Sequence, residues 1–271
     1  GDVHIKYGYI EGDDVYVVKI ASGFYRNPAL GLPVGQGLML AFGRTTGELR
    51  AVLLDGGLLT RIRTGVAGAL AARYLAPPSV ERIGVIGAGN QARWQVRMLA
   101  QVLPTREIVV FSEPQKGIEG YREEMEEEGF RVQAVGSAAE VAEGCELIVT
   151  TTPARDPVLP ADAVRPGTHI TGVGADTPGK RELESELFRR ADRVVGDSRE
   201  QCRVRGECAH AIGAGTLNPD DIVELGSVIA ADVPGREEGE QITIADLTGV
   251  AVEDIAITRS VLAAAEQAAK S

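Results

Sequence analysis

A glycine-rich stretch carries the clearest chemistry in this sequence. Residues 82–92 read RIGVIGAGNQA, so a short apolar run, 83–86, leads directly into a GxGxxA pattern. In a strand–turn–helix unit, the first glycine makes a tight turn, the second lets the backbone approach a pyrophosphate, and the alanine permits close packing of helix on strand. The N–H groups of the first helical turn then face the phosphates. An ordinary tight turn is the alternative, but the stretch predicts a dinucleotide site formed by Gly87, Gly89, Asn90, Gln91 and Ala92.

The end of the next apolar run bears on the choice of dinucleotide. There the chain reads Ser112-Glu113. A carboxylate in this place accepts a hydrogen bond from a ribose 2′-OH and repels a 2′-phosphate, which favours NAD, with NADP as the alternative. Ser112 competes with Glu113 for the deciding position, and Glu113 has the simpler interpretation of a loop cap.

Three further charged residues could do chemistry, although each also has an ordinary explanation. Lys19 stands between apolar residues in VVKIASG, where its stem can pack while the ammonium reaches solvent. Arg63, in RIRTG, can be an exposed charge on a helix, with Arg61 as its nearby competitor. Asp176, in VGADTPGK, can form a turn, but it also follows an apolar run at the strand end where ligands bind in open α/β sheets.

Alternating elements predict the scaffold for these residues. Between residues 80 and 197, apolar runs of strand length alternate with amphipathic segments, which is typical of βαβ units and a doubly wound parallel sheet. We expect strands at 83–86, 108–111, 132–135, 147–151, 169–173 and 193–196. We expect helices at 90–102, 115–128, 138–143 and 181–190. The result is a Rossmann-type dinucleotide-binding domain over 80–197.

The flanking segments predict a second lobe. Residues 7–24 alternate around a Gly-Asp-Asp turn, as a hairpin does, and two more strands follow before a helix over 59–75 that Pro77-Pro78 ends. The text after residue 197 becomes helical and closes with a helix over 254–269. Because residues 1–79 and 198–271 are each too short for a good core, we expect them to pack together as an α+β lobe for substrate binding and dimerisation.

Composition excludes several classes of protein. The 271 residues include 39 acidic and 28 basic side chains, so the net charge of −11 disfavours nucleic acid as a partner. No apolar run has the length of a membrane span, and no secretion signal is recognisable, so we expect a cytoplasmic protein. The three cysteines show no metal-ligand spacing and are expected to be reduced thiols. The three histidines are isolated, His169 is expected in the core, and no metal site is predicted.

Several longer motifs together resemble the ornithine cyclodeaminase/mu-crystallin family. They are VVKIASGFYRNPALGLP, TGELRAVLLDGGLLTRIRTGVAGALAARYLAP, GAGNQA, VGADTPGKREL and ITIADLTGVAVEDIA, in the order in which the family carries them. The resemblance spans essentially the whole chain. It implies a homodimer with a substrate cleft facing the nicotinamide, and about fifty further residues at the N-terminus of usual members.

The resemblance also implies roles for individual residues. Arg63 matches the arginine that grips the substrate α-carboxylate, since a planar guanidinium can hold both oxygens. Lys19 matches a lysine that reaches the substrate, either for proton transfer or to hold the carboxylate. Asp176 matches a carboxylate that manages the proton on the imine nitrogen. Further candidates near the cofactor are Thr151, Thr152, Pro153 and Val173, with a late loop over 246–249 near the active site.

Family chemistry passes through an α-imino acid, so the resemblance implies an NAD(P)-dependent oxidoreductase that transfers hydride at the α carbon of a small amino or imino acid. We prefer an imino-acid reductase or amino-acid dehydrogenase to an ornithine or lysine cyclodeaminase that uses catalytic NAD. Cyclodeaminases of the family carry an acidic residue upstream of the Lys19 position, whereas this chain has HIKY at 4–7. A second cation there suits a dicarboxylate such as iminosuccinate, or a short neutral imino acid, better than a diamino acid. A cofactor-binding protein without turnover, like the crystallins, is the second alternative.

Overall fold

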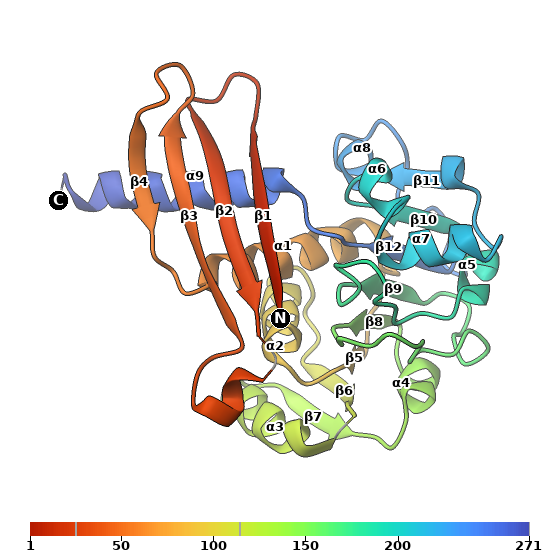
Figure 1. The fold of residues 1–271 in the computed structure, drawn as a ribbon. Helices are drawn as coiled ribbons and strands as arrows, with labels where there is room; N and C mark the ends of the chain where they lie inside the picture. Colours follow the sequence, from red (N-terminus) through yellow and green to blue (C-terminus); the bar gives the residue numbers. More distant parts are fainter. Residues whose placement is uncertain (25, 114, 271) are drawn as a thin grey trace. The chain divides into compact units, whose positions relative to one another are not determined.

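The computed structural model describes residues 1–24, 26–113 and 115–270 (Figure 1). The chain divides into two compact units. One comprises Gly1–Thr64 with Gly249–Ser271, and the other comprises Gly65–Thr248. The division falls within helix α1 (Leu58–Leu75).

The first unit is a four-stranded antiparallel sheet with a long helix on one face. The strands β1 (Asp2–Tyr9), β2 (Val15–Gly23), β3 (Gly35–Gly43) and β4 (Leu49–Leu53) pair in chain order. The helix is α9 (Ala251–Ala268), which crosses the sheet in Figure 1, and a short 3₁₀ helix, η1 (Asn27–Leu30), follows β2. Val17, Met39, Leu59 and Ile255 form the core between them. The predicted hairpin is confirmed, because Tyr9 pairs with Tyr16 across the turn.

The second unit contains an eight-stranded parallel sheet, in the order β11-β10-β12-β9-β8-β5-β6-β7. Six strands lie where the apolar runs predicted them: β5 (Ile83–Ile86), β6 (Glu107–Phe111), β7 (Arg131–Ala134), β8 (Leu147–Thr150), β9 (His169–Gly172) and β10 (Arg193–Gly196). The chain order reverses at β5, whose neighbours are β6 and β8. Such a switch point opens a crevice at the carboxyl ends of the strands.

Helices cover both faces of this sheet. One apolar core gathers side chains from the later part of α1, from α2 (Asn90–Leu99), α3 (Ile118–Glu127) and α8 (Leu225–Ile229). The other core gathers α4 (Ala138–Gly144), α5 (Glu186–Arg190), α6 (Arg199–Cys202) and α7 (Gly206–Gly213). Two 3₁₀ helices, η2 (Gln115–Gly117) and η3 (Pro219–Asp221), lie in connections. Successive strand residues point to alternate cores, so the predicted α/β doubly wound class is confirmed.

The predicted domain boundaries need correction. The segment after residue 197 supplies two strands of the large sheet, β11 (Ile222–Glu224) beside β10, and β12 (Thr243–Asp246) between β9 and β10. Residues 198–248 therefore belong to the unit that carries the glycine loop, as do residues 65–79. β11 reads IVE and β12 reads TIAD, so neither forms a marked apolar run, and the sequence predicts helices there and assigns the segment to the other lobe.

The predicted helix over 181–190 is also shorter than expected, since α5 begins only at Glu186. The backbone N–H groups of Glu182 and Leu183 donate instead to the carboxylate of Glu207, at 2.7 and 3.0 Å. These long-range bonds hold residues 181–185 in an extended path that the helical propensity of KRELESE does not reveal.

His169 is a core residue, as predicted. It is fully buried, its Nδ1 lies 2.8 Å from Thr243 Oγ1, and its Nε2 lies 3.0 Å from Thr171 Oγ1. Burial, and then the charge of Arg236, lower the pKa of His169 to about 3, so the ring is neutral at physiological pH. Within the described ranges, no helix combines the length and apolarity that crossing a bilayer requires.

Candidate functional site

The glycine loop has the conformation that its sequence predicted. Gly87 has a φ of +103°, and a Cβ there would lie 2.8 Å from Thr151 Oγ1, so the position requires glycine. Its N–H donates to Phe111 O at 2.7 Å, which continues the parallel pairing of β5 with β6. The loop therefore emerges at the carboxyl edge of the sheet, at its switch point.

The start of α2 fits the pyrophosphate of a dinucleotide. Gly89 is the N-cap and supplies no side chain to the helix, and a Cβ on it would meet nothing within 4 Å, so the space above its backbone is open. The first-turn N–H groups of Asn90, Gln91 and Ala92 carry the positive end of the helix dipole, while the Ala92 side chain is fully buried against the sheet. Arg93 donates to the carbonyls of Ala88 at 2.7 Å and Gly89 at 3.1 Å, and so holds the loop from outside.

The other predicted cofactor residues lie at the same edge. Ser112 and Glu113 follow β6 directly, with Ser112 partly buried and Glu113 exposed. Thr151 donates its N–H to Ile86 O at 2.9 Å, which places the Thr151-Thr152-Pro153 segment beside the end of β5. Val173 is buried and donates to Thr150 O at 3.0 Å. All of the predicted cofactor-binding residues therefore lie at the carboxyl edge of the parallel sheet in the second unit.

A buried carboxylate that the sequence did not single out supports this edge. Glu182 is completely buried, and it accepts hydrogen bonds from Thr150 Oγ1 at 2.7 Å, Thr152 N at 2.5 Å and Gly174 N at 2.7 Å. It thereby ties the end of β8 to the end of β9. Burial raises its pKa, while these donors oppose the rise. In the sequence Glu182 is one charge among several in KRELESE, so no local signal marks it.

Asp176 stands in the loop that Glu182 anchors. Its carboxylate is 44% exposed and accepts a hydrogen bond from the Lys180 ammonium at 2.8 Å, four residues on, while the Lys180 side chain is 7% exposed. A turn follows Asp176, because the Lys180 N–H donates to Thr177 O at 3.2 Å. The half-exposed carboxylate remains within reach of a ligand at the strand end.

In the first unit, Lys19 and Arg63 converge on one carboxylate. Lys19 projects from β2 and is 1% exposed, and its Nζ lies 3.0 Å from Asp254 Oδ1 and 2.9 Å from Asp254 Oδ2. Arg63, in α1, places its Nε 3.2 Å from Asp254 Oδ1 and its Nη1 2.5 Å from Glu253 Oε2. The interpretation of Lys19 as a lysine with a solvated ammonium is therefore wrong. Arg61, the competitor, reaches the carbonyl of Gly56 at 3.4 Å instead.

A third cation joins this group. Lys6 of β1 is paired directly opposite Lys19 of β2, and its Nζ donates to Gly249 O at 2.7 Å, just before α9. Like charges opposite each other destabilise a sheet, so the pair calls for anions nearby. Two carboxylates, Glu253 and Asp254, contact Lys19 and Arg63. A group rich in cations is the kind of site that a substrate carboxylate can join.

The electrostatics of Lys19 follow from this packing. Burial is the largest influence and lowers the pKa of Lys19, and the positive charge of Arg63 lowers it further. Asp254 opposes both through its charge and its hydrogen bond. A lysine poised in this way can hold an anion when charged and can exchange a proton more readily than a solvated lysine.

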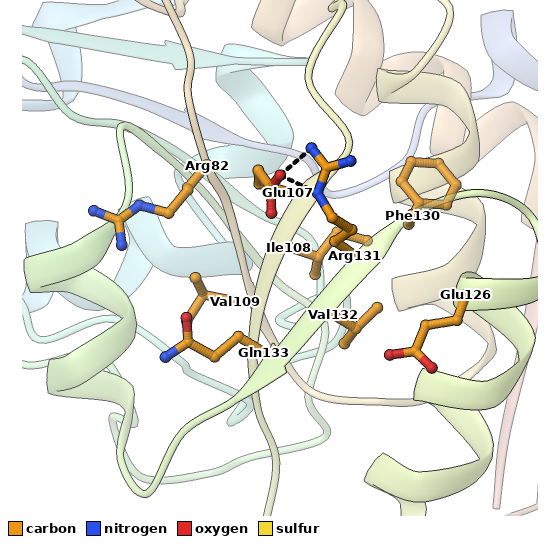
Figure 2. A pocket seen from close by; sticks show the side chains of 9 residues that line it. All are labelled: Arg82, Glu107, Ile108, Val109, Glu126, Phe130, Arg131, Val132 and Gln133. Carbon is orange, nitrogen blue, oxygen red and sulfur yellow. Dashed lines mark hydrogen bonds and ion pairs between the residues drawn. The ribbon is translucent and has the colours of Figure 1, made fainter.

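A separate pocket lies at the opposite edge of the parallel sheet. Figure 2 shows its lining, in which the first residues of β6 and β7 contribute Glu107 and Arg131, paired with each other, and Arg82 approaches from the turn before β5. These are the amino ends of the strands. Because open α/β sheets bind ligands at the carboxyl ends, we do not assign the chemistry to this pocket.

Comparison with known proteins finds similarity over almost the whole chain. The model of the ornithine cyclodeaminase/mu-crystallin family matches residues 1–269. An archaeal alanine dehydrogenase dimer with bound NAD is similar over 95% of this chain and 83% of its own, with a TM-score of 0.86 and 33% identity. The iminosuccinate reductase of Paracoccus denitrificans in complex with NAD⁺ gives a TM-score of 0.88 and 33% identity over 98% of this chain and 82% of its own. A lysine cyclodeaminase gives a TM-score of 0.88 and 34% identity over 98% and 76%.

Loss of the shared carboxylate should destabilise the first unit. Asp254→Asn leaves Lys19 and Arg63 as neighbouring buried charges, so we expect a loss of about 3–5 kcal/mol in the free energy of unfolding. The matched control is Asp14→Asn, which breaks an ion pair of the same 2.9 Å length to Arg50, but between side chains that are 71% and 48% exposed. That control should lose less than about 1 kcal/mol. Urea unfolding measures both, and equal losses would contradict the assignment.

Proposed function

Because the chain belongs to the ornithine cyclodeaminase/mu-crystallin family, we propose that it is an NAD-dependent oxidoreductase that acts on a small α-amino or α-imino acid. The reaction is hydride transfer at the α carbon. In the reductive direction, the C=N bond of an imino acid gains a hydride at carbon and a proton at nitrogen, which yields the amine. The buried meeting of Lys19 and Arg63 at Asp254 is the observation that carries this proposal, since it prepares a cationic site for a carboxylate.

NAD is the cofactor of this proposal, and when bound it donates or accepts the hydride. The chain's part is to hold it. The glycine loop and the start of α2 bind the pyrophosphate through Gly87, Gly89, Asn90, Gln91 and Ala92. Glu113 or Ser112 contacts the adenine-side ribose, and a carboxylate there favours NAD over NADP. The residues beside the nicotinamide end are Thr151, Thr152, Pro153 and Val173. Similar proteins carry NAD or NAD⁺ in their structures.

The substrate-binding roles follow from charge and orientation. Asp254 fixes the Arg63 guanidinium by its contact with Nε, and the planar fork can then hold both oxygens of an α-carboxylate. Lys19 stabilises the same carboxylate or exchanges a proton with the substrate, and its lowered pKa suits either task. Asp176 manages the proton at the imine nitrogen, where a carboxylate stabilises the positive charge.

Two alternatives keep the same fold. A cyclodeaminase would use NAD catalytically, and one of the similar structures is a lysine cyclodeaminase that recognises lysine and ornithine. It would release ammonia and a cyclic amino acid with no net change in NADH. A cofactor-binding protein without turnover would bind NADH but remain inactive with every substrate. The residue types at Lys19, Arg63 and Asp176 favour an enzyme, because a protein without turnover could lose Asp176 and keep its fold.

Steady-state assays test the proposed activity. NADH and NADPH should each be tried with ammonia and a panel of 2-oxo acids, and NAD⁺ with alanine, aspartate, proline, ornithine and lysine. Arg63→Ala should reduce kcat/KM by about 30-fold to 1000-fold, equivalent to about 2–4 kcal/mol, because the charge-assisted carboxylate bonds are lost. Arg61→Ala, on the same helix, should stay within about threefold of the wild type. No net NADH turnover by a wild-type protein that binds NADH would contradict the proposal.

We propose further that the preferred substrate is a dicarboxylate, because Lys6 adds a cation opposite Lys19. Lys6→Met should lower kcat/KM for iminosuccinate, formed from oxaloacetate and ammonia, by about 10-fold to 100-fold, the value of one charged hydrogen bond. The same variant should change kcat/KM for the imine of pyruvate by less than about threefold. The monocarboxylate serves as the internal control. Equal losses with both substrates would assign Lys6 to the fold alone.

We propose that the protein is a homodimer in the cytoplasm, with the outer face of the first sheet as the interface. Four alternate residues of β1 expose apolar or aromatic side chains on that face, namely Val3, Ile5, Tyr7 and Tyr9, at 60–76% exposure. A patch of this kind on a folded unit marks an interaction surface, and a second copy offers the matching patch. Sedimentation velocity should find dimers, and Ile5→Glu should shift them to monomers, whereas Val204→Glu, equally exposed, should not. A monomeric wild type would exclude this interface.

A further inference from the structure

Two cysteines and an aspartate meet inside the second unit. Cys202 ends α6, Cys208 lies in the first turns of α7, and Asp246 ends β12. Their thiol and carboxylate ligand atoms all lie within 4.8 Å of one another. The two cysteines have no exposed surface and Asp246 is 1% exposed. The hydride transfer proposed above assigns no role to their side chains.

A second carboxylate borders the same cluster. Asp197 follows β10 and is partly buried, and its Oδ1 lies 3.8 Å from Cys202 Sγ and 2.8 Å from Thr248 Oγ1. Strand register brings Asp197 to the cluster. Gly196 of β10 pairs with Asp246 of β12, and Asp197 is the residue that follows Gly196. Asp197 is thus a partly buried carboxylate beside Cys202.

The spacing matches tetrahedral coordination by a thiophilic cation. With Zn–S near 2.3 Å and Zn–O near 2.1 Å, sulfur and oxygen ligands are about 3.6 Å apart, and two sulfurs about 3.8 Å apart. The 3.8 Å separation between Asp197 Oδ1 and Cys202 Sγ, and the 4.8 Å bound on the other three groups, are compatible with this geometry after small side-chain rotations. Two thiolates and carboxylates form a donor set that zinc prefers over magnesium or calcium.

The cluster buries three ionisable groups together, which is costly unless they stay neutral or gain a positive partner. Asp246 also accepts the Cys208 N–H at 2.8 Å with Oδ2, and a carboxylate can keep that bond with one oxygen while the other coordinates.

We propose that Cys202, Cys208 and Asp246, with Asp197 as the fourth ligand, form a structural binding site for Zn²⁺ that ties α6 and α7 to the end of β12. Each thiol that coordinates gives its proton to solvent, and no electron transfer is involved. Four protein ligands would close the coordination sphere, so the ion stabilises the fold and is not a catalyst. The site is independent of the proposed enzymatic activity.

Cobalt titration tests the proposal directly. The reduced, chelator-treated full chain is titrated with Co²⁺, which should produce visible absorption together with a thiolate-to-metal charge-transfer band that saturates at about one ion per chain. Zn²⁺ should then displace the cobalt. Cys202→Ala and Cys208→Ala should each weaken or remove the charge-transfer band, and Asp246→Asn should raise the dissociation constant about tenfold or more. The matched control is Cys145→Ala, because Cys145 is equally buried in the same unit but lies outside the cluster.

Thermal unfolding keeps the proposal testable if the cluster variants fold poorly. Zn²⁺ should raise the unfolding temperature of the wild type and of Cys145→Ala, and a chelator should reverse the rise, because a ligand that binds only the native state stabilises it. A folded wild type with no charge-transfer band, or a band that persists in the Cys202→Ala/Cys208→Ala double variant, would overturn the proposal. If the reduced protein shows no charge-transfer band and oxidation forms a Cys202–Cys208 disulfide, the proposal is also overturned, and the cysteines are a redox pair.

Discussion

The first unit depends on one buried carboxylate. Asp254 sits at the start of α9 and contacts the ammonium of Lys19 and the guanidinium of Arg63, from a strand and from another helix. Burying any one of these charges alone would cost several kcal/mol, whereas together they compensate one another. This contact brings β2, α1 and α9 together at one point. It also holds the ammonium of Lys19 and the guanidinium of Arg63 close to each other in a buried position. The proposed carboxylate-binding site rests on this arrangement.

The second unit uses buried carboxylates in another way. Glu182 and Glu207 face mainly N–H and hydroxyl donors, and they fix the strand ends and the loop that carries Asp176. Loops between strand ends are usually the most variable parts of such a sheet. The two glutamates restrain these loops, and so they position Asp176 without contacting a ligand themselves. Asp246 acts similarly at the start of α7, where it accepts the N–H of Cys208. The same carboxyl edge thus carries the cofactor loop and the thiol cluster.

The sequence by itself determined what depends on neighbouring residues. The GxGxxA spacing required a turn with positive φ at Gly87 and an open backbone at Gly89, and both are present. Apolar runs of four or five residues located six strands of the parallel sheet, because strands buried on both faces need continuous apolar side chains. The family motifs single out Lys19 and Arg63 as candidate substrate-binding residues, and the structure brings both to Asp254. Each of these signals depends only on residues that are close in the sequence, so it can be recognised without knowledge of the fold.

Only the tertiary structure decided which distant residues meet. Lys19 and Asp254 are 235 positions apart, and no periodicity in either segment indicates their contact. β12 inserts between β9 and β10. Its four residues lie in a segment for which the sequence predicts helices. Cys208 and Asp246 likewise meet through strand order and not through spacing. The physical reason is common to all three: compensation of buried charge and pairing of strands are set by neighbours in space, which a linear pattern does not specify.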